Sequence, residues 1–239
     1  MKIASMKWML LLALGLLLVG CQATEAKEEL ADGSLTTEVV DSHSQGNNDS
    51  DDHDHDHSEE DEKIYKGYFE DNQVEHRSLS DWEGNWQSVY PYLLDGTLDE
   101  VFTHKAEATG KMSATEYKEY YEIGYKTDTE RIVIQGDTVT FFTDGEEVSG
   151  KYEADGFEIL TYEAKNKGVR YIFKLVEPTE GLPQYIQFSD HRIAPDVSDH
   201  YHLYGGDDRE ALLEEVVNWP TYYPSTMDGH TIAHEMIAH

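Results

Sequence analysis

Cysteine is nearly absent from this 239-residue chain, which carries a single one at position 21. No disulfide can form within one chain, so a folded domain must be stabilised by its apolar core. Basic residues are also scarce, with 18 lysines and arginines against 49 aspartates and glutamates and a formal net charge of −31. Binding to nucleic acid requires a basic surface, so nucleic acid is excluded as a partner and cations are the natural ligands.

The motifs of common catalytic sites are missing as well. The sequence has no glycine-rich phosphate loop and no G-x-S-x-G turn, so we predict no catalytic residues. Near the C-terminus, His234, Glu235 and His239 imitate a metalloprotease motif, but a spacing of five rotates the second histidine away by about 140°. His230 and His234 are four apart and could share a metal; an exposed helix near the chain end is the simpler interpretation.

An apolar run at residues 8–20 follows Lys2 and Lys7. Its 13 residues are fewer than the roughly 20 that span a bilayer, and Leu-Val-Gly-Cys at 18–21 reads as a lipobox that is cut before the cysteine. We therefore predict a lipoprotein signal peptide at residues 1–20 and lipidation, such as palmitate, at Cys21. An ordinary signal peptide with a chance cysteine is the alternative. The predicted location is the extracellular face of a bacterial cell membrane, and the lone cysteine favours a Gram-positive bacterium.

Residues 21–63 form an acidic segment with 15 aspartates and glutamates against two lysines and few large apolar side chains. Too little apolar surface can be buried to offset chain entropy, so we predict a disordered tether. Within it, His53, His55 and His57 alternate with aspartates, which offers weak, exchangeable ligand sets to divalent ions. A solvated spacer is the alternative, but it leaves the three histidines unexplained.

Residues 64–239 have the pattern of one folded, mainly β domain. From residue 131 onward, apolar and polar residues alternate in short runs, with glycines 136, 145, 156 and 168 in hairpin positions. Seven or so short antiparallel strands are expected, and such a meander closes into a small barrel. The expected strands cover residues 131–136, 138–145, 146–156, 157–168, 169–178, 182–190 and 200–206.

Helices are expected on both sides of the strand region. Ser113, with Glu116 three residues later, forms a capping box that begins one helix, and Asp207 or Asp208 can cap another after the strands. The expected helices cover residues 82–94, 98–108, 113–125, 208–219 and the tail from 227.

Three histidines, His191, His200 and His202, form the strongest candidate site. Residues two apart in a strand point to the same face, so His200 and His202 can aim at a point that His191 reaches from the preceding strand. Three neutral imidazoles suit zinc and leave a fourth tetrahedral position open, so we predict a metal site here. Two surface histidines on a strand edge would be the alternative for an isolated pair. Asp190 and Asp199 adjoin ligands and are candidates to orient the rings.

Five segments also carry a family resemblance: SDWEGNWQSVYPYL, DGFEILTY, KGVRYIF, PQYIQFSDHRIAP and NWPTYYP. In this order they resemble the ZinT (YodA) family of zinc-binding proteins, and also the C-terminal domain of zinc-uptake lipoproteins of Gram-positive bacteria. The resemblance runs from about Tyr68 to the C-terminus. It implies a calycin or lipocalin-like antiparallel barrel with flanking helices, in which His191, His200 and His202 hold zinc at the barrel mouth.

The resemblance also implies extracytoplasmic scavenging of zinc, with cadmium or other divalent cations as further ligands, and transfer to the binding protein of a zinc ABC importer. Periplasmic relatives often carry a cysteine pair, and the matching positions here are Gly150 and Leu175. A monomeric, non-enzymatic zinc-binding protein is the leading hypothesis. Two alternatives stay open: a zinc-dependent hydrolase, since an open zinc position can activate water, and a lipocalin-type binder of a small ligand, suggested by 16 tyrosines and four tryptophans.

Overall fold

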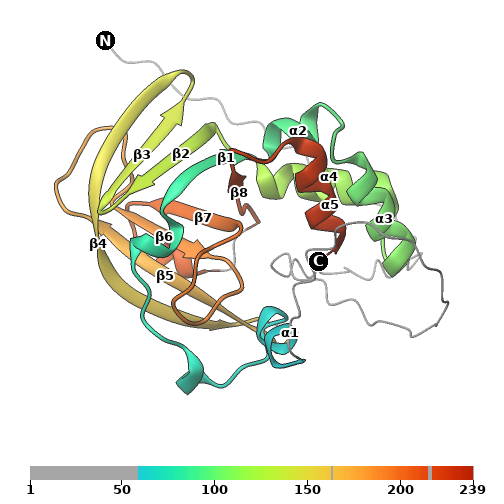
Figure 1. The fold of residues 1–239 in the computed structure, drawn as a ribbon, viewed down its shortest axis with the longest axis horizontal. Coiled ribbons are helices and arrows are strands. Elements are labelled where there is room, and N and C mark those ends of the chain that lie inside the picture. The colour runs from blue at the N-terminus through green and yellow to red at the C-terminus, as the bar shows by residue number, and fades with distance from the viewer. Residues whose placement is uncertain (1–58, 163, 215–216, 239) are drawn as a thin grey trace, which may run out of the picture.

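Eight antiparallel strands, each paired with the next along the chain and the last with the first, form a closed barrel in the described part of the chain (Figure 1). The computed structural model describes residues 59–162, 164–214 and 217–238. The closed barrel confirms the predicted fold class. The strands are β1 (Gly84–Ser88), β2 (Thr129–Gln135), β3 (Thr138–Thr143), β4 (Glu146–Thr161), β5 (Lys167–Leu175), β6 (Tyr185–Ser189), β7 (Tyr201–Gly206) and β8 (Thr221–Pro224).

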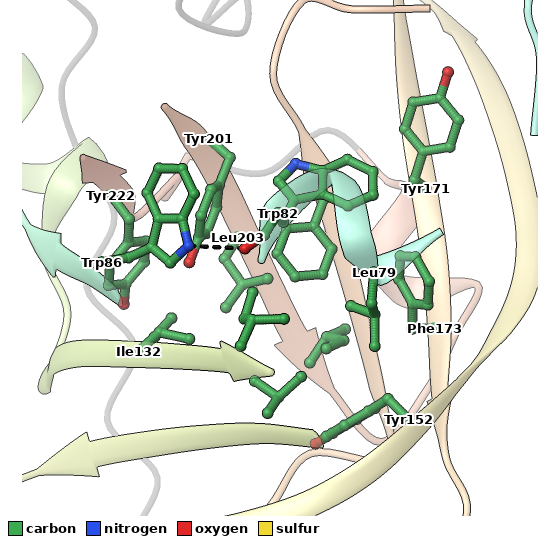
Figure 2. Close-up of a cluster of buried hydrophobic side chains, with 14 of the residues drawn as sticks. Leu79, Trp82, Trp86, Ile132, Tyr152, Tyr171, Phe173, Tyr201, Leu203 and Tyr222 are labelled. Carbon is green, nitrogen blue, oxygen red and sulfur yellow. Dashed lines mark hydrogen bonds between the residues drawn. The ribbon is translucent and has the colours of Figure 1, made fainter. Parts of the chain in front are cut away.

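Aromatic side chains fill the barrel interior (Figure 2). Trp82 stacks on Phe188 with ring centroids 4.7 Å apart. The indole Nε1 of Trp86 donates a hydrogen bond of 2.8 Å to the Trp82 carbonyl (Figure 2). Both tryptophans are almost fully buried, so the segment before β1 and β1 itself serve as the centre of the core. This packed interior, rather than any covalent link, stabilises the barrel.

A second apolar cluster joins the barrel to a group of helices that lie on one side of it (Figure 1). The helices pack closely against the barrel at Gly124. A Cβ atom at this position would lie 2.3 Å from the Trp219 ring, so only glycine permits the contact. Asn218 donates hydrogen bonds to the carbonyls of Ile123, Gly124 and Lys126, which fastens the end of α4 to the start of β8. The helices are α1 (Glu59–Tyr65), α2 (Tyr90–Leu94), α3 (Asp99–Thr109), α4 (Ala114–Tyr125) and α5 (Gly229–Ala238). Within the described residues, none of them has the length and apolar character to cross a bilayer.

Some expected helices are confirmed and others are wrong. The helix predicted at 98–108 is α3, the capping box of Ser113 and Glu116 begins α4, and the tail predicted to be helical from residue 227 contains α5. The helix predicted at 82–94 is wrong, because residues 84–88 form β1 between a 3-10 turn and the short α2. Its burial alternates, with Trp86 and Ser88 buried and Asn85 exposed, since β1 closes the barrel between β2 and β8.

The predicted helix at 208–219 is also wrong. Asp208 does accept hydrogen bonds from the backbone N–H groups of Glu210 and Ala211, but only a 3-10 turn at Ala211–Leu213 follows. Glu214 is already extended, and the chain then runs to β8, a strand that the sequence analysis did not predict.

Two of the four predicted hairpin glycines are confirmed: Gly136 and Gly145 lie in turns with φ values of +60° and +80°. Gly156 is different, because it lies within β4 at a bulge where φ is +94°. The two strands predicted at 146–156 and 157–168 are therefore largely one long, bent strand. Gly168 lies inside β5, where a Cβ atom would meet the Tyr162 hydroxyl at 2.3 Å.

The predicted boundary between tether and domain, at residues 63 and 64, falls inside α1. The signal peptide at 1–20, the lipidated Cys21 and the tether histidines His53, His55 and His57 lie outside the described residues, as does His239.

A buried arginine ties the segment before β1 to the loop between β6 and β7. The Arg77 side chain is fully buried, and its Nε donates to Asp81 at 2.8 Å while one terminal nitrogen donates to Asp190 at 2.6 Å. Its other terminal nitrogen donates to the Asp196 carbonyl at 2.8 Å, and the guanidinium lies over the Trp82 ring at 4.1 Å. The start and the middle of the β6–β7 loop are therefore held by one side chain.

Removing this charge should destabilise the fold strongly. We expect Arg77→Met to lower the free energy of unfolding by about 3 kcal/mol, because two buried carboxylates lose their counter-ion. The matched control is Lys151→Met, which removes an ion pair of 2.9 Å between side chains that are more than half exposed and should cost less than about 1 kcal/mol. Urea unfolding followed by tryptophan fluorescence measures both, and equal losses would contradict the special role of Arg77.

Candidate metal centre

The structure brings His191, His200 and His202 together. One ring nitrogen from each lies within 4.8 Å of the others, and the ring centroids are 5.8, 5.8 and 6.0 Å apart. His191 lies two residues after the end of β6, while His200 directly precedes β7 and His202 lies within it. All three side chains are half-buried, so they converge at the protein surface and remain accessible from solvent.

The site lies outside the barrel interior. Tyr201 and Leu203 pack into the interior cluster, so His202 between them faces the other way. Tyr223, which contacts His200, belongs to the second cluster beside the helices. The histidines therefore meet on the outer side of the barrel wall, near the ends of β6 and β7, which refines the position at the barrel mouth that the resemblance implies.

A hydrogen-bonded chain sets the orientation of His202. Its Nδ1 lies 2.8 Å from the Thr221 hydroxyl, which itself donates a hydrogen bond of 2.9 Å to the Trp219 carbonyl. Because the hydroxyl proton is committed to that carbonyl, the hydroxyl accepts from His202, and Nδ1 carries the hydrogen. The lone pair is then on Nε2, which is free to bind a metal, and the arrangement is the usual support for a histidine ligand.

Tyrosines stack on the other two rings. Tyr223 of β8 lies parallel to His200, with centroids 5.0 Å apart and an interplanar angle of 11°. Tyr65 of α1 stacks on His191 at 4.5 Å and 24°. Each of the three imidazoles is therefore contacted by a separate side chain, and two of these side chains, Thr221 and Tyr223, come from β8.

The charge state of the site suits a cation. Burial lowers the pKa of His202 well below its usual range, and His191, His200 and Arg170 add to the effect. His202 is therefore neutral, which is the form that binds metals. Burial also raises the pKa of Tyr223 far above its ordinary value, and burial with the nearby Asp199 raises that of Tyr65 to about 12, so both phenols are neutral.

His191 has a left-handed backbone, with φ of +63°, in the loop held by Arg77. The carboxylate of Asp190 accepts from Arg77, and Asp199 and Asp196 both pair with Arg192. The hydrogen bonds that Asp190 and Asp199 accept from arginines therefore hold the loop. The ring of His202 is oriented by its hydrogen bond to Thr221.

The residues missed by the sequence analysis are Tyr65, Thr221 and Tyr223. Thr221 is opposite His202 in the pairing of β7 with β8, so a correct prediction of β8 would have revealed it. The tail histidines His230 and His234 are exposed on α5. Among the described residues, the three-histidine group is the one cluster with metal-ligand spacing.

The donor set fits a borderline-soft divalent ion. Three neutral imidazole nitrogens supply three corners of a tetrahedron and leave one corner for water or an incoming ligand. The half-buried position keeps that corner within reach of another molecule.

Known proteins carry the same domain. Residues 60–239 match the family described as "ZinT (YodA) periplasmic lipocalin-like zinc-recruitment". The "Probable metal-binding protein YrpE" of Bacillus subtilis (strain 168) is 72% identical over 180 residues, which cover 75% of this chain and 72% of that protein. The "Zinc-binding protein AdcA" of Streptococcus pyogenes serotype M3 (strain ATCC BAA-595 / MGAS315) is 54% identical over 180 residues, which cover 74% of this chain and 35% of AdcA.

Solved structures agree with these matches. The crystal structure of the Zn(II)-bound ZinT-like domain of Streptococcus pneumoniae AdcA has a TM-score of 0.71 at 49% identity, covering 73% of this chain and 97% of that domain. Zn(II)-bound AdcA from the same species has a TM-score of 0.72 at 50% identity, covering 74% of this chain and 38% of AdcA. The chain thus spans about a third of AdcA and nearly all of its ZinT-like domain. As its sequence motifs predicted, the chain belongs to the ZinT (YodA) family.

Proposed function

We propose that this protein is a lipid-anchored, extracytoplasmic zinc-binding protein that captures zinc through His191, His200 and His202. The observation that carries the proposal is the convergence of three ring nitrogens within 4.8 Å of one another. The domain at 64–239 binds the metal, and the bound zinc passes to the binding protein of a zinc ABC importer. Cadmium or other divalent ions are secondary ligands, because imidazole sites do not select zinc by affinity alone.

The relatives support zinc as the ligand. AdcA is named a zinc-binding protein, and the solved ZinT-like domain that resembles this chain is described as Zn(II)-bound. The Bacillus relative is named a probable metal-binding protein. AdcA of Streptococcus pneumoniae is named a zinc-binding lipoprotein, which supports a lipid anchor at Cys21 after removal of residues 1–20. We extend this to an outer-face location in a Gram-positive bacterium, to a monomer, and to a tether at 21–63 whose His53, His55 and His57 capture metal weakly.

A site of this construction suits transfer better than storage. Three protein ligands with an open fourth position allow a partner's ligand to bind before the first ligands leave. The half-buried rings let such a partner approach. The acidic chain raises the local concentration of cations around the site.

The two alternative functions receive less support. The barrel interior is occupied by the aromatic cluster around Trp82 and Trp86, which leaves the centre of the barrel to side chains rather than to a lipocalin-type ligand. A hydrolase requires a general base placed beside the open metal position. Asp199, the carboxylate nearest in sequence to His200, is engaged by Arg192, so we propose no catalytic residue.

The ligand assignment is tested by zinc titration calorimetry on residues 21–239 with Cys21 changed to serine. We expect one tight site in the parent protein, and its loss when His191→Ala and His200→Ala are combined, because a single remaining imidazole cannot hold the ion.

The matched control combines His230→Ala and His234→Ala, a pair four residues apart on exposed α5, and should keep the tight site. Replacement of His53, His55 and His57 by alanine should remove only weak binding. Tight binding that survives the His191 and His200 changes would overturn the assignment.

The support given by Thr221 makes a second prediction. Thr221→Val preserves the side-chain shape but removes the acceptor for His202 Nδ1, so we expect zinc affinity to fall by about tenfold. Thr140→Val is the control, since the Thr140 hydroxyl pairs with Ser149 on the surface of the barrel, away from the site. Competition with a zinc-binding dye measures both affinities, and unchanged affinity of the Thr221 variant would show that His202 does not depend on this hydrogen bond.

Acid should release the metal with a characteristic slope. Burial lowers the pKa of His202 well below its ordinary value, so protons do not compete with zinc for this ring near neutral pH. The other two ligands are imidazoles, which in unperturbed peptides take up protons near pH 6.5 and then compete with zinc. Below about pH 6 the logarithm of the affinity should therefore fall with a slope approaching two per pH unit. Calorimetry from pH 5 to 8 measures this, and a pH-independent affinity would be incompatible with three histidine ligands.

A further inference from the structure

The short helix α1 contributes an aromatic side chain to the metal centre from outside the barrel. Tyr65, its last residue, stacks on the His191 ring at 4.5 Å. Burial is the main cause of the raised pKa values of Tyr121, Tyr125 and Tyr223, and the nearby Tyr65 phenol adds to each of them from beside α4 and β8. Tyr65 therefore extends from His191 toward α4 and β8.

A small hollow lies beneath α1 and is lined by both α1 and the ligands. Its volume is about 30 Å³, which accommodates a single water molecule. Ile64 and Tyr65 line it from α1, while His191 and His202 line it from the site. The helix thus covers one side of the histidine group.

The attachment of α1 differs from that of the other helices. None of its residues is buried, and it lies apart from the group formed by α2 to α5 (Figure 1). The chain turns into the barrel at Gly67, which has φ of +82° and whose carbonyl accepts a hydrogen bond of 2.8 Å from the Lys167 backbone. A Cβ atom at Gly67 would lie 2.3 Å from the Lys167 carbonyl, so this anchor point is fixed. The helix before it packs through the partly buried Ile64 and Tyr65, and its first five residues are exposed. Short, exposed elements open at low free-energy cost.

We propose that α1 is a movable cover of the metal centre, in which Tyr65 closes over His191 and limits the rate at which zinc enters and leaves. This inference rests on the proposed function. The neutral phenol stacks on the face of His191 and does not act as a metal ligand. Four carboxylates in the first turn, Glu59, Glu60, Asp61 and Glu62, give the cover a charge that favours approaching cations.

A cover predicts a specific kinetic pattern. An element that closes over both the empty and the loaded site slows entry and exit together, so its loss accelerates both and changes the equilibrium little. If the open form makes up about a tenth of the molecules, Tyr65→Ala should raise both rate constants by about tenfold. A residue that only supports a ligand would instead raise the dissociation rate and weaken the affinity in proportion.

The experiment uses residues 21–239 with Cys21→Ser and zinc alone as the ligand. Stopped-flow mixing with zinc gives the association rate constant, release to an excess of chelator gives the dissociation rate constant, and calorimetry gives the affinity. We expect Tyr65→Ala and Tyr65→Leu to accelerate both rates with affinity within about threefold of the parent. Tyr65→Phe keeps the stacked ring and should behave as the parent does. The matched control is Tyr68→Ala, since Tyr68 is 52% exposed and follows α1 by three residues.

The outcomes are distinct. Unchanged rates in Tyr65→Ala would overturn the cover, as would a faster dissociation with an equal loss of affinity and no change in association. Acceleration in Tyr68→Ala to the same extent would also overturn it, because the effect would then not belong to the residue on His191. Absence of tight zinc binding in the parent protein would overturn the proposed function itself, and the cover with it.

Discussion

The buried charge of Arg77 is the constraint on which the metal centre depends. Its guanidinium binds Asp81 beside the interior tryptophans and Asp190 at the end of β6, so the core and the loop of His191 share one anchor. A buried charge is costly unless its hydrogen bonds are satisfied, and here the third partner is the Asp196 carbonyl. A loop conformation that moved Asp190 or the Asp196 carbonyl away would leave part of this buried charge without a partner, so these contacts favour the observed position of His191 relative to β7.

The three histidine rings are contacted by elements of different kinds. His202 and His200 are supported by Thr221 and Tyr223, which both belong to β8, a strand hydrogen-bonded on both sides within the barrel. His191 is in a loop and stacks on Tyr65 from a peripheral helix. Two of the histidines are thus supported from the barrel wall, while the third is held at its backbone by the loop and contacted by a peripheral helix.

The sequence predicted the residues of the site better than their supports. Spacing alone identified His191, His200 and His202, because a strand places residues two apart on one face. The alternating runs predicted most of the barrel, but β1 and β8 were missed, since both are short and their pairing partners are distant in sequence. β1 was mistaken for helix because Trp82, Trp86, Val89 and Leu93 recur at helical spacing across the segment that contains it. Thr221, Tyr223 and Tyr65 act across tertiary contacts, which local patterns do not encode.

The position of the site outside the packed interior follows from electrostatics. A divalent ion inside an aromatic core would lose its hydration with little compensation, because the cluster around Trp82 contains no imidazole or carboxylate to replace the water. On the outer wall, the barrel still supplies rigid strands while solvent reaches the open coordination position. The acidic surface attracts every cation alike, whereas neutral nitrogen donors favour zinc over the harder ions that prefer oxygen. Under the proposed function, cation attraction and metal selection are therefore performed by different residues, and only selection depends on the position of His191, which Arg77 helps to hold.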